Sequence, residues 1–325
     1  MRVAERRPLT LRIRPDGIAP IAALLAVLLI LIAFVQPDFL APGSLMSFLG
    51  RSAPIILLAA GQYFVIVSGE FDLSVGSLVT AQVVVAARLI DSEPSHTWPV
   101  VALLLVGGAF VGLVNGVVTT VLRVPSFITT LGMFLILVGA VYLWSDGAPK
   151  GGLSEEFRRF GRRAIEDVPL LGRIPYALLV LVVVAAIAVA LTRSDFGRTL
   201  VAVGDNPRTA ELSGVRVGLT KTIAFVLSGV AAAIAAILLG GYSGVSFQAG
   251  VGLEFGAITA VVLGGVALGG GRGSVVGAML GALTLETLFA LMNFIGVSGA
   301  LRSTVQGAII LLAVAVSASR SSSSR

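Results

Sequence analysis

Few side chains in this sequence are placed to do chemistry, and most of them fall in one polar stretch, residues 68–77. The stretch sets the carboxylates of Glu70 and Asp72 among glycines and serines, between apolar runs at 55–67 and 78–90. In hydrocarbon every backbone N–H and C=O needs a partner, so irregular backbone is tolerated only at an interface, in packed protein or along a wet cavity. From spacing alone, a plain turn between helices and a functional loop both fit.

The other reactive residues do not form a constellation with recognisable chemistry. The sequence contains no cysteine, and its single histidine, His96, lies in a polar loop with too few ligands for a metal. A phosphate-binding loop needs glycine before its lysine, whereas Thr220 precedes Lys221. The glycines at 269–274 lack the last glycine and the βαβ unit of a dinucleotide site. We therefore expect no catalytic residue, no metal and no cofactor bound by this chain.

Composition defines the class of protein. Of 325 residues, 56% are hydrophobic and 12% are charged, and the mean hydropathy is +1.00. An ordinary soluble chain has about 25% charged residues. The net charge of +6 comes from short basic segments beside apolar runs, which suits membrane orientation better than nucleic-acid binding. We predict an all-α fold, a polytopic transmembrane helical bundle.

Ten apolar segments can supply the helices of this bundle. The first follows a basic tail at 1–17, exceeds the apolar core of a signal peptide and lacks a cleavage site, so we expect it to be retained. Several segments are near the ~17-residue minimum for a crossing, and some can be broken or re-entrant. We predict one transmembrane domain, 18–317, with segments at 18–35, 45–67, 73–90, 99–122, 126–144, 175–192, 222–241, 253–268, 274–294 and 299–317.

The charges between the segments predict an orientation. If both termini are cytoplasmic, Arg123, the loop 193–221, Arg272 and the tail 318–325 all lie inside, as the positive-inside rule requires. The loop 145–174 then lies outside, although it holds six basic residues against five acidic ones. A topology shifted by two crossings is the alternative.

Glycines mark the faces where helices meet. Close approach of helices in lipid needs small residues. Glycines recur at 107, 108, 112 and 116 on one segment and at 273, 277 and 281 on another. A weak internal repeat also lays residues 56–76 over 257–277, with Gly69 on Gly270 and Gly76 on Gly277. We interpret these glycines as packing positions.

The loop 193–221 contains the best-defined polar element, a short capped helix. Asp205 and Asn206 can cap its start, Pro207 suits the first helical position, and Gly214 supplies a left-handed stop. A solvated connector and an element on which a soluble partner pushes are both compatible with this pattern.

The loop 145–174 contains a second short helix. Ser154 can cap it, and Phe157 lies on an apolar face with Leu153 and Phe160. Arginines 158, 159, 162 and 163 lie opposite. We predict an external gate or docking surface, and an interfacial helix without a partner is the alternative.

The sequence resembles the membrane permease subunits of ribose/xylose/galactose-type ATP-binding-cassette sugar importers. The resemblance runs from about residue 55 to 316 in collinear order. It rests on GEFDLSVGS at 69–77, NG at 115–116 with VPSFITTLG at 124–132, the pieces GR, AVGDN and AELSGV between 197 and 215, AVVLGG at 260–265 and GGRGSVVG at 270–277.

This resemblance implies roles for two groups of residues. The loop 193–221 corresponds to the family's coupling helix, which docks into the ATPase, and residues 68–77 to its signature loop. Glu70 and Glu286 depart from the family pattern, so the resemblance gives them no role. The implied coupling residues are Gly204, Asp205, Asn206, Pro207, Arg208, Glu211, Ser213 and Gly214, and the signature residues are Gly69, Asp72, Ser74 and Gly76.

A third group of site residues is predicted from polar or aromatic side chains that stand in otherwise apolar segments. Polar side chains within a membrane tend to face the interior of the bundle. We predict that the substrate path is lined by Gln62, Asn115, Phe127, Thr129 and Asn293.

The resemblance also implies partners and a location. It implies a cytoplasmic ATPase that carries ATP and magnesium, an extracytoplasmic sugar-binding protein, and a second permease subunit, identical or paralogous, in the cell inner membrane. Importers of nucleosides or branched-chain amino acids are the nearest alternatives. An ion-coupled secondary transporter would instead use intramembrane carboxylates such as Glu286. A purely structural membrane protein is the third reading, and the sequence does not name the sugar.

Overall fold

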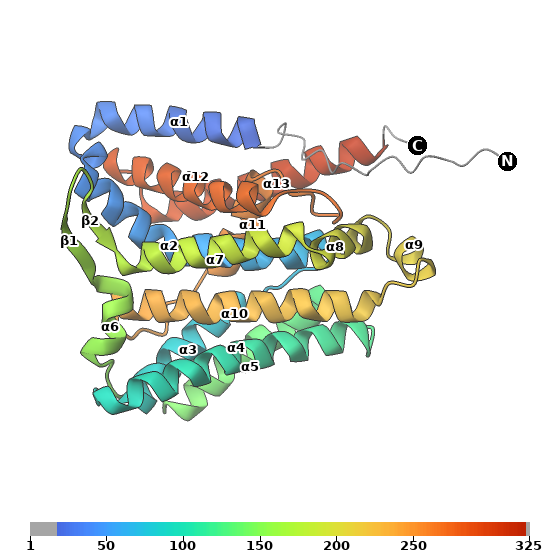
Figure 1. Ribbon diagram of the computed structural model, residues 1–325, viewed down its shortest axis with the longest axis horizontal. Helices are drawn as coiled ribbons and strands as arrows, with labels where there is room; N and C mark the ends of the chain where they lie inside the picture. The colour runs from blue at the N-terminus through green and yellow to red at the C-terminus, as the bar shows by residue number, and fades with distance from the viewer. Residues whose placement is uncertain (1–17, 323–325) are drawn as a thin grey trace.

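Each of the ten apolar segments forms a helix in the computed structural model, which describes residues 18–322 and the side chains of residues 18–312 (Figure 1). The predicted tail at 1–17 and the last three residues, 323–325, lie outside this range. The helices are α1 (Ile18–Val35), α2 (Pro42–Val67), α3 (Val75–Ile90), α4 (Thr97–Thr120), α5 (Ser126–Trp144), α7 (Tyr176–Arg193), α10 (Val217–Ser243), α11 (Leu253–Leu263), α12 (Val275–Phe294) and α13 (Gly299–Ser322).

The predicted transmembrane helical bundle is confirmed. Within the described range, seven helices are long and apolar enough to cross a membrane. The last helix, α13, continues past the predicted end at residue 317 to Ser322.

Two helices are short because they begin inside the bundle. α3 has 16 residues and α11 has 11. At 1.5 Å per residue, α11 covers about 16 Å, roughly half of a ~30 Å hydrocarbon core. The chain before α11 reaches α3, where the Gly250 N–H donates to Thr80 Oγ1 at 2.9 Å. The predicted segment 253–268 is therefore helical only as far as Leu263.

α2 and α10 form the centre of the bundle. Most of α2 is buried, and α10 packs along both α2 and α4. A Cβ added at Gly112 would overlap the carbonyl of Phe225 in α10, and one added at Gly281 would overlap the carbonyl of Ala260 in α11. The predicted glycine faces are thus real helix contacts, in which main chains touch directly.

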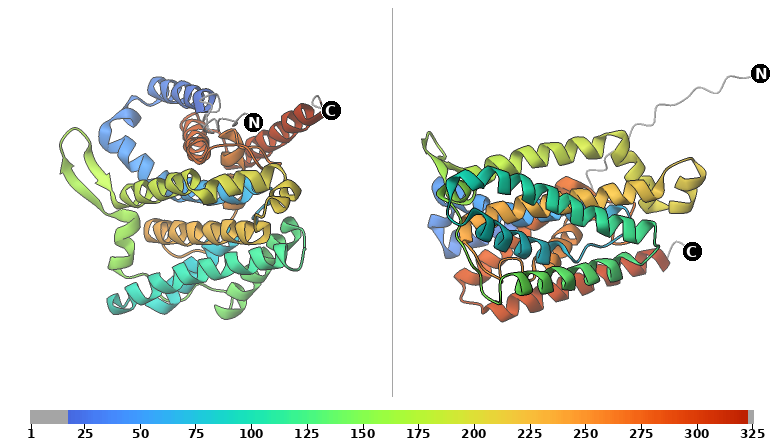
Figure 2. Two further views of the ribbon diagram at one scale, coloured as in Figure 1. Left: turned by 45° about the vertical axis from the view of Figure 1, so that its right-hand side comes forward. Right: turned by 90° about the horizontal axis from the view of Figure 1, so that it is seen from below.

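The polar elements gather at the two opposite ends of the bundle (Figures 1 and 2). One end carries α6 and a two-stranded antiparallel hairpin, and the other carries α8 and α9. The elements are η2 (Pro37–Leu40), η3 (Pro94–His96), α6 (Glu155–Arg162), β1 (Ala164–Val168), β2 (Gly172–Pro175), α8 (Asp195–Asp205) and α9 (Pro207–Leu212).

The hairpin is a feature that the sequence did not predict. β1 and β2 pair with Ala164 opposite Pro175 and Ile165 opposite Ile174, and the register shifts between Glu166 and Val168. Figure 2 shows it standing away from the helices, at the end opposite α9. Its strands are short and carry charged residues, and their burial does not alternate, so they lack the apolar pattern that identifies a strand.

Candidate functional site

The signature loop is irregular backbone from residue 68 to 74, exposed at Gly69 and buried from Asp72 onward, while Gly76 and Ser77 of the predicted stretch lie in the first turn of α3. It links α2 to α3, and Ser68, Asp72 and Ser74 are each at most 2% exposed. Its backbone finds partners on α5: the Phe71 N–H donates to Ser126 Oγ and the Leu73 N–H to Thr130 Oγ1, both at 3.1 Å. Packed protein therefore supplies the hydrogen bonds that lipid cannot.

The Asp72 carboxyl group is the centre of this loop. Its Oδ1 accepts from the Ser74 N–H at 3.0 Å and from Ser74 Oγ at 2.6 Å. Its Oδ2 accepts from Ser228 Oγ on α10 at 2.9 Å. One side chain thus fixes the shape of the loop and ties it to the central helix.

Two predicted path residues belong to the same cluster. Gln62 and Asn115 are fully buried. With its amide nitrogen placed toward the Asp72 carbonyl, Gln62 donates to that C=O and accepts from the Asp72 N–H, each at 3.3 Å. Asn115 Nδ2 donates to Ser74 Oγ at 2.9 Å. These contacts hold the signature loop in place.

The other three predicted path residues lie apart from this cluster. Phe127 is 55% exposed on α5, and Thr129 lies half-buried on the same helix. Asn293 is exposed near the end of α12, where its Oδ1 accepts from Arg302 Nη2 at 3.1 Å. The structure does not bring the five residues together, and their role in a path stays a prediction.

Three chain segments meet beside the signature loop through glycines, in what we call the glycine junction: Gly69, Gly204, Gly270 and Gly271. A Cβ on Gly204 would overlap the Val67 carbonyl, and one on Gly271 would lie 2.6 Å from Asp205 Cα. The Gly271 N–H donates to the Val67 carbonyl at 2.9 Å. Gly69 and Gly270, the paired glycines of the internal repeat, have φ of +86° and +83°, and a Cβ added on Gly270 would lie 2.9 Å from the Gly69 nitrogen.

The predicted capped helix is present as α9, with one correction. Asn206 Oδ1 accepts from the Thr209 N–H at 3.0 Å and caps the helix. Asp205 does not cap it, because Asp205 is the last residue of α8. Gly214 has a φ of +83°, and the next N–H, of Val215, returns to the Ala210 carbonyl at 3.1 Å. This is a Schellman ending, as a left-handed glycine allows.

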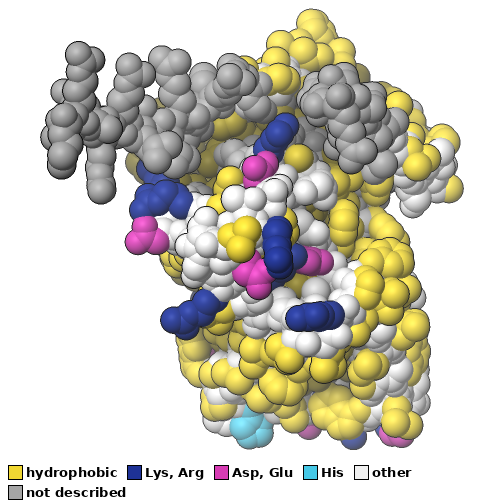
Figure 3. Space-filling view, turned by 90° about the vertical axis from the view of Figure 1, so that its right-hand side faces the viewer, with side chains coloured by type: hydrophobic (Ala, Val, Ile, Leu, Met, Phe, Trp, Pro, Cys, Tyr) yellow, Lys and Arg dark blue, Asp and Glu magenta, His cyan; other side chains and the backbone are white. Residues whose placement is uncertain are grey.

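The surface of α9 is exposed and polar, except for one leucine. Arg208 Nη1 and Glu211 Oε2 lie 3.6 Å apart with both side chains in solvent. Leu212 is 77% exposed. Figure 3 looks onto this end of the molecule, where charged side chains of both signs lie over the centre and hydrophobic side chains flank them.

The opposite end presents the predicted amphipathic helix, α6. Ser154 Oγ accepts from the Phe157 N–H at 3.2 Å, and Phe157 is fully buried. Arg162 Nε donates to the carbonyl of Tyr242 at the end of α10, at 3.1 Å. The helix is therefore fixed to the bundle with its arginine-rich side outward.

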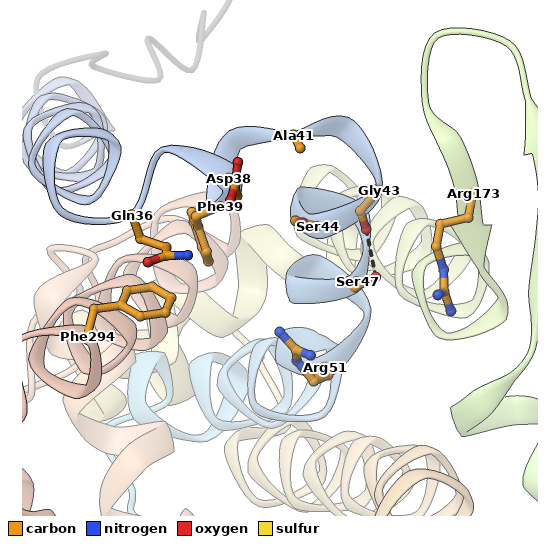
Figure 4. Close-up of a pocket in the computed structure, with 10 residues that line it drawn as sticks. All are labelled: Gln36, Asp38, Phe39, Ala41, Gly43, Ser44, Ser47, Arg51, Arg173 and Phe294. Carbon is orange, nitrogen blue, oxygen red and sulfur yellow. Dashed lines mark hydrogen bonds between the residues drawn. The ribbon is translucent and has the colours of Figure 1, made fainter.

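A hollow of about 610 Å³ lies beside the hairpin at this same end. Figure 4 shows Arg51 from α2 and Arg173 from β2 on its wall. Its apolar floor includes Phe39 and Phe294, whose rings meet edge to face with centroids 5.6 Å apart. The hollow adds two cationic groups and the carboxylate of Asp38 to the arginines of α6.

Sequence reasoning missed the partners of the signature loop. Ser126, Thr130 and Ser228 hold it, and none of them was a predicted site residue. Small hydroxyl residues in apolar helices commonly bond across helices. That signal marks many positions at once, and only the fold shows which of them face the loop.

The Asp72 cluster yields a stability prediction. In Asp72→Asn one carboxylate oxygen becomes an amide nitrogen, which cannot accept a hydrogen bond. The buried hydroxyl of Ser74 or Ser228 therefore loses its acceptor. The free energy of unfolding should fall by about 1–3 kcal/mol. The control is Asp91→Asn: Asp91 is exposed with a φ of +46°, which asparagine tolerates, so the change should stay within about 0.5 kcal/mol. Unfolding of both variants in detergent measures the difference, and equal losses would contradict the cluster's role.

Comparison with known proteins places this architecture in a family. The ribose import permease protein of Escherichia coli K12 is 36% identical over 90% of this chain and 91% of that protein. The ribose import permease protein of Bacillus subtilis is 35% identical, over 89% of each chain. The galactose/methyl galactoside import permease protein of E. coli K12 is 34% identical over 91% of this chain and 92% of that protein. No solved structure matches the chain significantly.

The family match covers most of the described bundle. Residues 44–314, from the start of α2 into α13, match the family described as the permease component of the branched-chain amino acid transport system. Together with the long apolar helices, the match makes this chain a multi-pass membrane protein and a transport subunit. The chain belongs to this family of membrane transport permeases.

Proposed function

We propose that this chain is the permease subunit of an ATP-binding-cassette importer and forms the path for a monosaccharide that a soluble binding protein delivers. The observation that carries the proposal is the similarity to ribose and galactose import permeases along 90% or more of the chain. ATP and magnesium belong to a separate ATPase in this proposal, since the sequence has no phosphate-binding loop.

The proposed orientation puts the α9 end in the cytoplasm of a cell whose inner membrane the bundle spans. Arg123 follows the end of α4 on this side, and the Gly271 contact places Arg272 next to α8. The positive-inside rule favours this arrangement, with both termini inside. The outer end then carries α6, the hairpin and the hollow with Arg51 and Arg173.

A second permease subunit, identical or paralogous, completes the proposed path. Large apolar side chains of α5 and α13, such as Leu135, Ile136 and Leu311, are more than 60% exposed. Lipid or a second subunit can cover such surfaces. Phe127 and Thr129 on α5 remain our candidates for the lining of the path.

Amino-acid import is a second candidate, because the family description itself names branched-chain amino acids. The similar sugar permeases favour the monosaccharide.

The function is tested by uptake into liposomes that contain this chain with its cell's ATPase and sugar-binding protein. We expect uptake of labelled ribose or galactose that needs ATP and both partners, and that continues after an uncoupler is added. Competition by excess leucine but not by sugars would favour the amino-acid alternative. Loss of uptake with an uncoupler at constant ATP would contradict an ATP-driven importer and favour an ion-coupled one.

α9 is the proposed docking helix for the ATPase, and two variants test it. Gly214→Val puts a β-branched residue at a φ of +83°, which costs on the order of 1–2 kcal/mol and displaces the helix end. Arg208→Glu with Glu211→Lys keeps a pair across three residues but inverts the charge pattern shown to a partner. Both variants should reach the membrane, bind less ATPase in co-purification and transport less solute. Full binding and uptake by the charge-swapped variant would show that α9 is only a connector.

α6 is the proposed docking surface for the binding protein. Its outward arginines lie at the same end as Arg51 and Arg173, and Glu155, Glu156 and Asp38 lie there too. We therefore propose that the arginine side of α6, and not the whole end, meets an acidic surface of the partner. Arg158→Glu with Arg159→Glu should reduce the ATP hydrolysis that the loaded binding protein stimulates, and should leave basal hydrolysis nearly unchanged. An equal decrease in both rates would argue against docking there.

A further inference from the structure

The described part of the chain contains one ion pair that joins distant segments. Lys221 Nζ lies 2.5 Å from Glu70 Oε1, and each side chain is only 15% exposed. The other ion pairs in residues 18–312 join groups three or four positions apart, and all their side chains are more than half exposed. Such exposed pairs contribute little, whereas a pair shielded from water costs much to break on one side.

The pair joins the signature loop to the helix that follows α9. Glu70 lies in the loop, and Lys221 lies in the second turn of α10, seven residues after Gly214. Ser228, which binds Asp72, is a further seven residues along α10. Seven residues are close to two helical turns, so Lys221 and Ser228 share one face, about 10 Å apart along the axis. α10 therefore holds the loop at two separate points.

We propose that Glu70 and Lys221 are positioning residues that make the signature loop move with α10 as one unit during transport. This rests on the proposed function, in which the ATPase displaces α9. α9 connects to α10 through only four residues, 213–216, so a displacement of α9 reaches Lys221 within the first two turns of α10. The Asp72–Ser228 bond fixes the middle of the loop, and the ion pair fixes its exposed beginning near Gly69.

An ion pair that only stabilises the fold would make the same contacts. The test therefore needs a readout that a change in stability alone does not alter. That readout is the amount of solute transported per ATP hydrolysed in the complete complex. The variants are Glu70→Gln, Lys221→Met and the exchanged pair Glu70→Lys with Lys221→Glu. The matched control is Glu93→Gln, an exposed carboxylate beyond the end of α3.

We expect both single variants to assemble with the ATPase and to keep basal hydrolysis within about twofold, while solute per ATP falls about fivefold or more, the lower end of typical coupling between sites. The exchanged pair should recover most of the ratio, and Glu93→Gln should match the wild type. The proposal would be overturned if the single variants transported a normal amount of solute per ATP. It would also be overturned if the exchanged pair assembled with the ATPase but transported as little solute per ATP as the single variants.

Cross-linking gives a second test that does not depend on the strength of the ion pair. This chain has no cysteine of its own, so in Glu70→Cys with Lys221→Cys a short bifunctional thiol reagent reacts at only these two positions of the chain. Before the reagent is added, this variant should show the low solute per ATP of the single variants, because its ion pair is lost. If the loop and α10 move as one unit, cross-linking should raise solute per ATP toward the wild-type value, and a further fall on cross-linking would overturn the proposal. Absence of ATP-driven uptake in the wild type would instead contradict the proposed function.

Discussion

The structure depends on the satisfaction of polar backbone inside an apolar bundle, and Asp72 shares this task with side chains of four helices. A seven-residue loop without regular structure cannot lie in hydrocarbon unless protein groups replace water. Asp72 takes donors from its own loop and from α10, while Ser126, Thr130, Gln62 and Asn115 serve the backbone and Ser74. The hydroxyl and amide side chains in these helices thus permit α3 to begin within the bundle.

Much of the architecture could be predicted because membrane helices follow local rules. Length and apolarity identified all ten segments, and the caps at Ser154 and Asn206 and the stop at Gly214 follow from neighbouring residues only. The misreading of Asp205 has the same origin. Asp205 and Asn206 are both good caps, and the choice between them depends on where α8 ends. Asn206 has an extended backbone, as expected for a residue before proline, so it follows the end of α8 and caps α9.

The site was less predictable because its contacts are distant in sequence. Gln62 and Asn115 were correctly singled out as buried polar groups, but burial does not distinguish a loop anchor from a path lining. Ser228 lies 156 residues from Asp72, and Lys221 lies 151 residues from Glu70. Pairings at that separation follow from the fold. The short strands of the hairpin also lacked a local signal, since apolar and polar side chains do not alternate regularly along them.

The glycine junction has a mechanical consequence. Side-chain contacts can absorb small displacements, because rotamers change at modest cost. Where Val67, Gly204 and Gly271 touch main chain to main chain, no rotamer is available, and the Gly271–Val67 hydrogen bond admits little stretching. The two halves of the internal repeat meet at this point through Gly69 and Gly270. The junction is therefore a rigid main-chain contact, at which sliding of one segment past another costs more than at a contact between side chains.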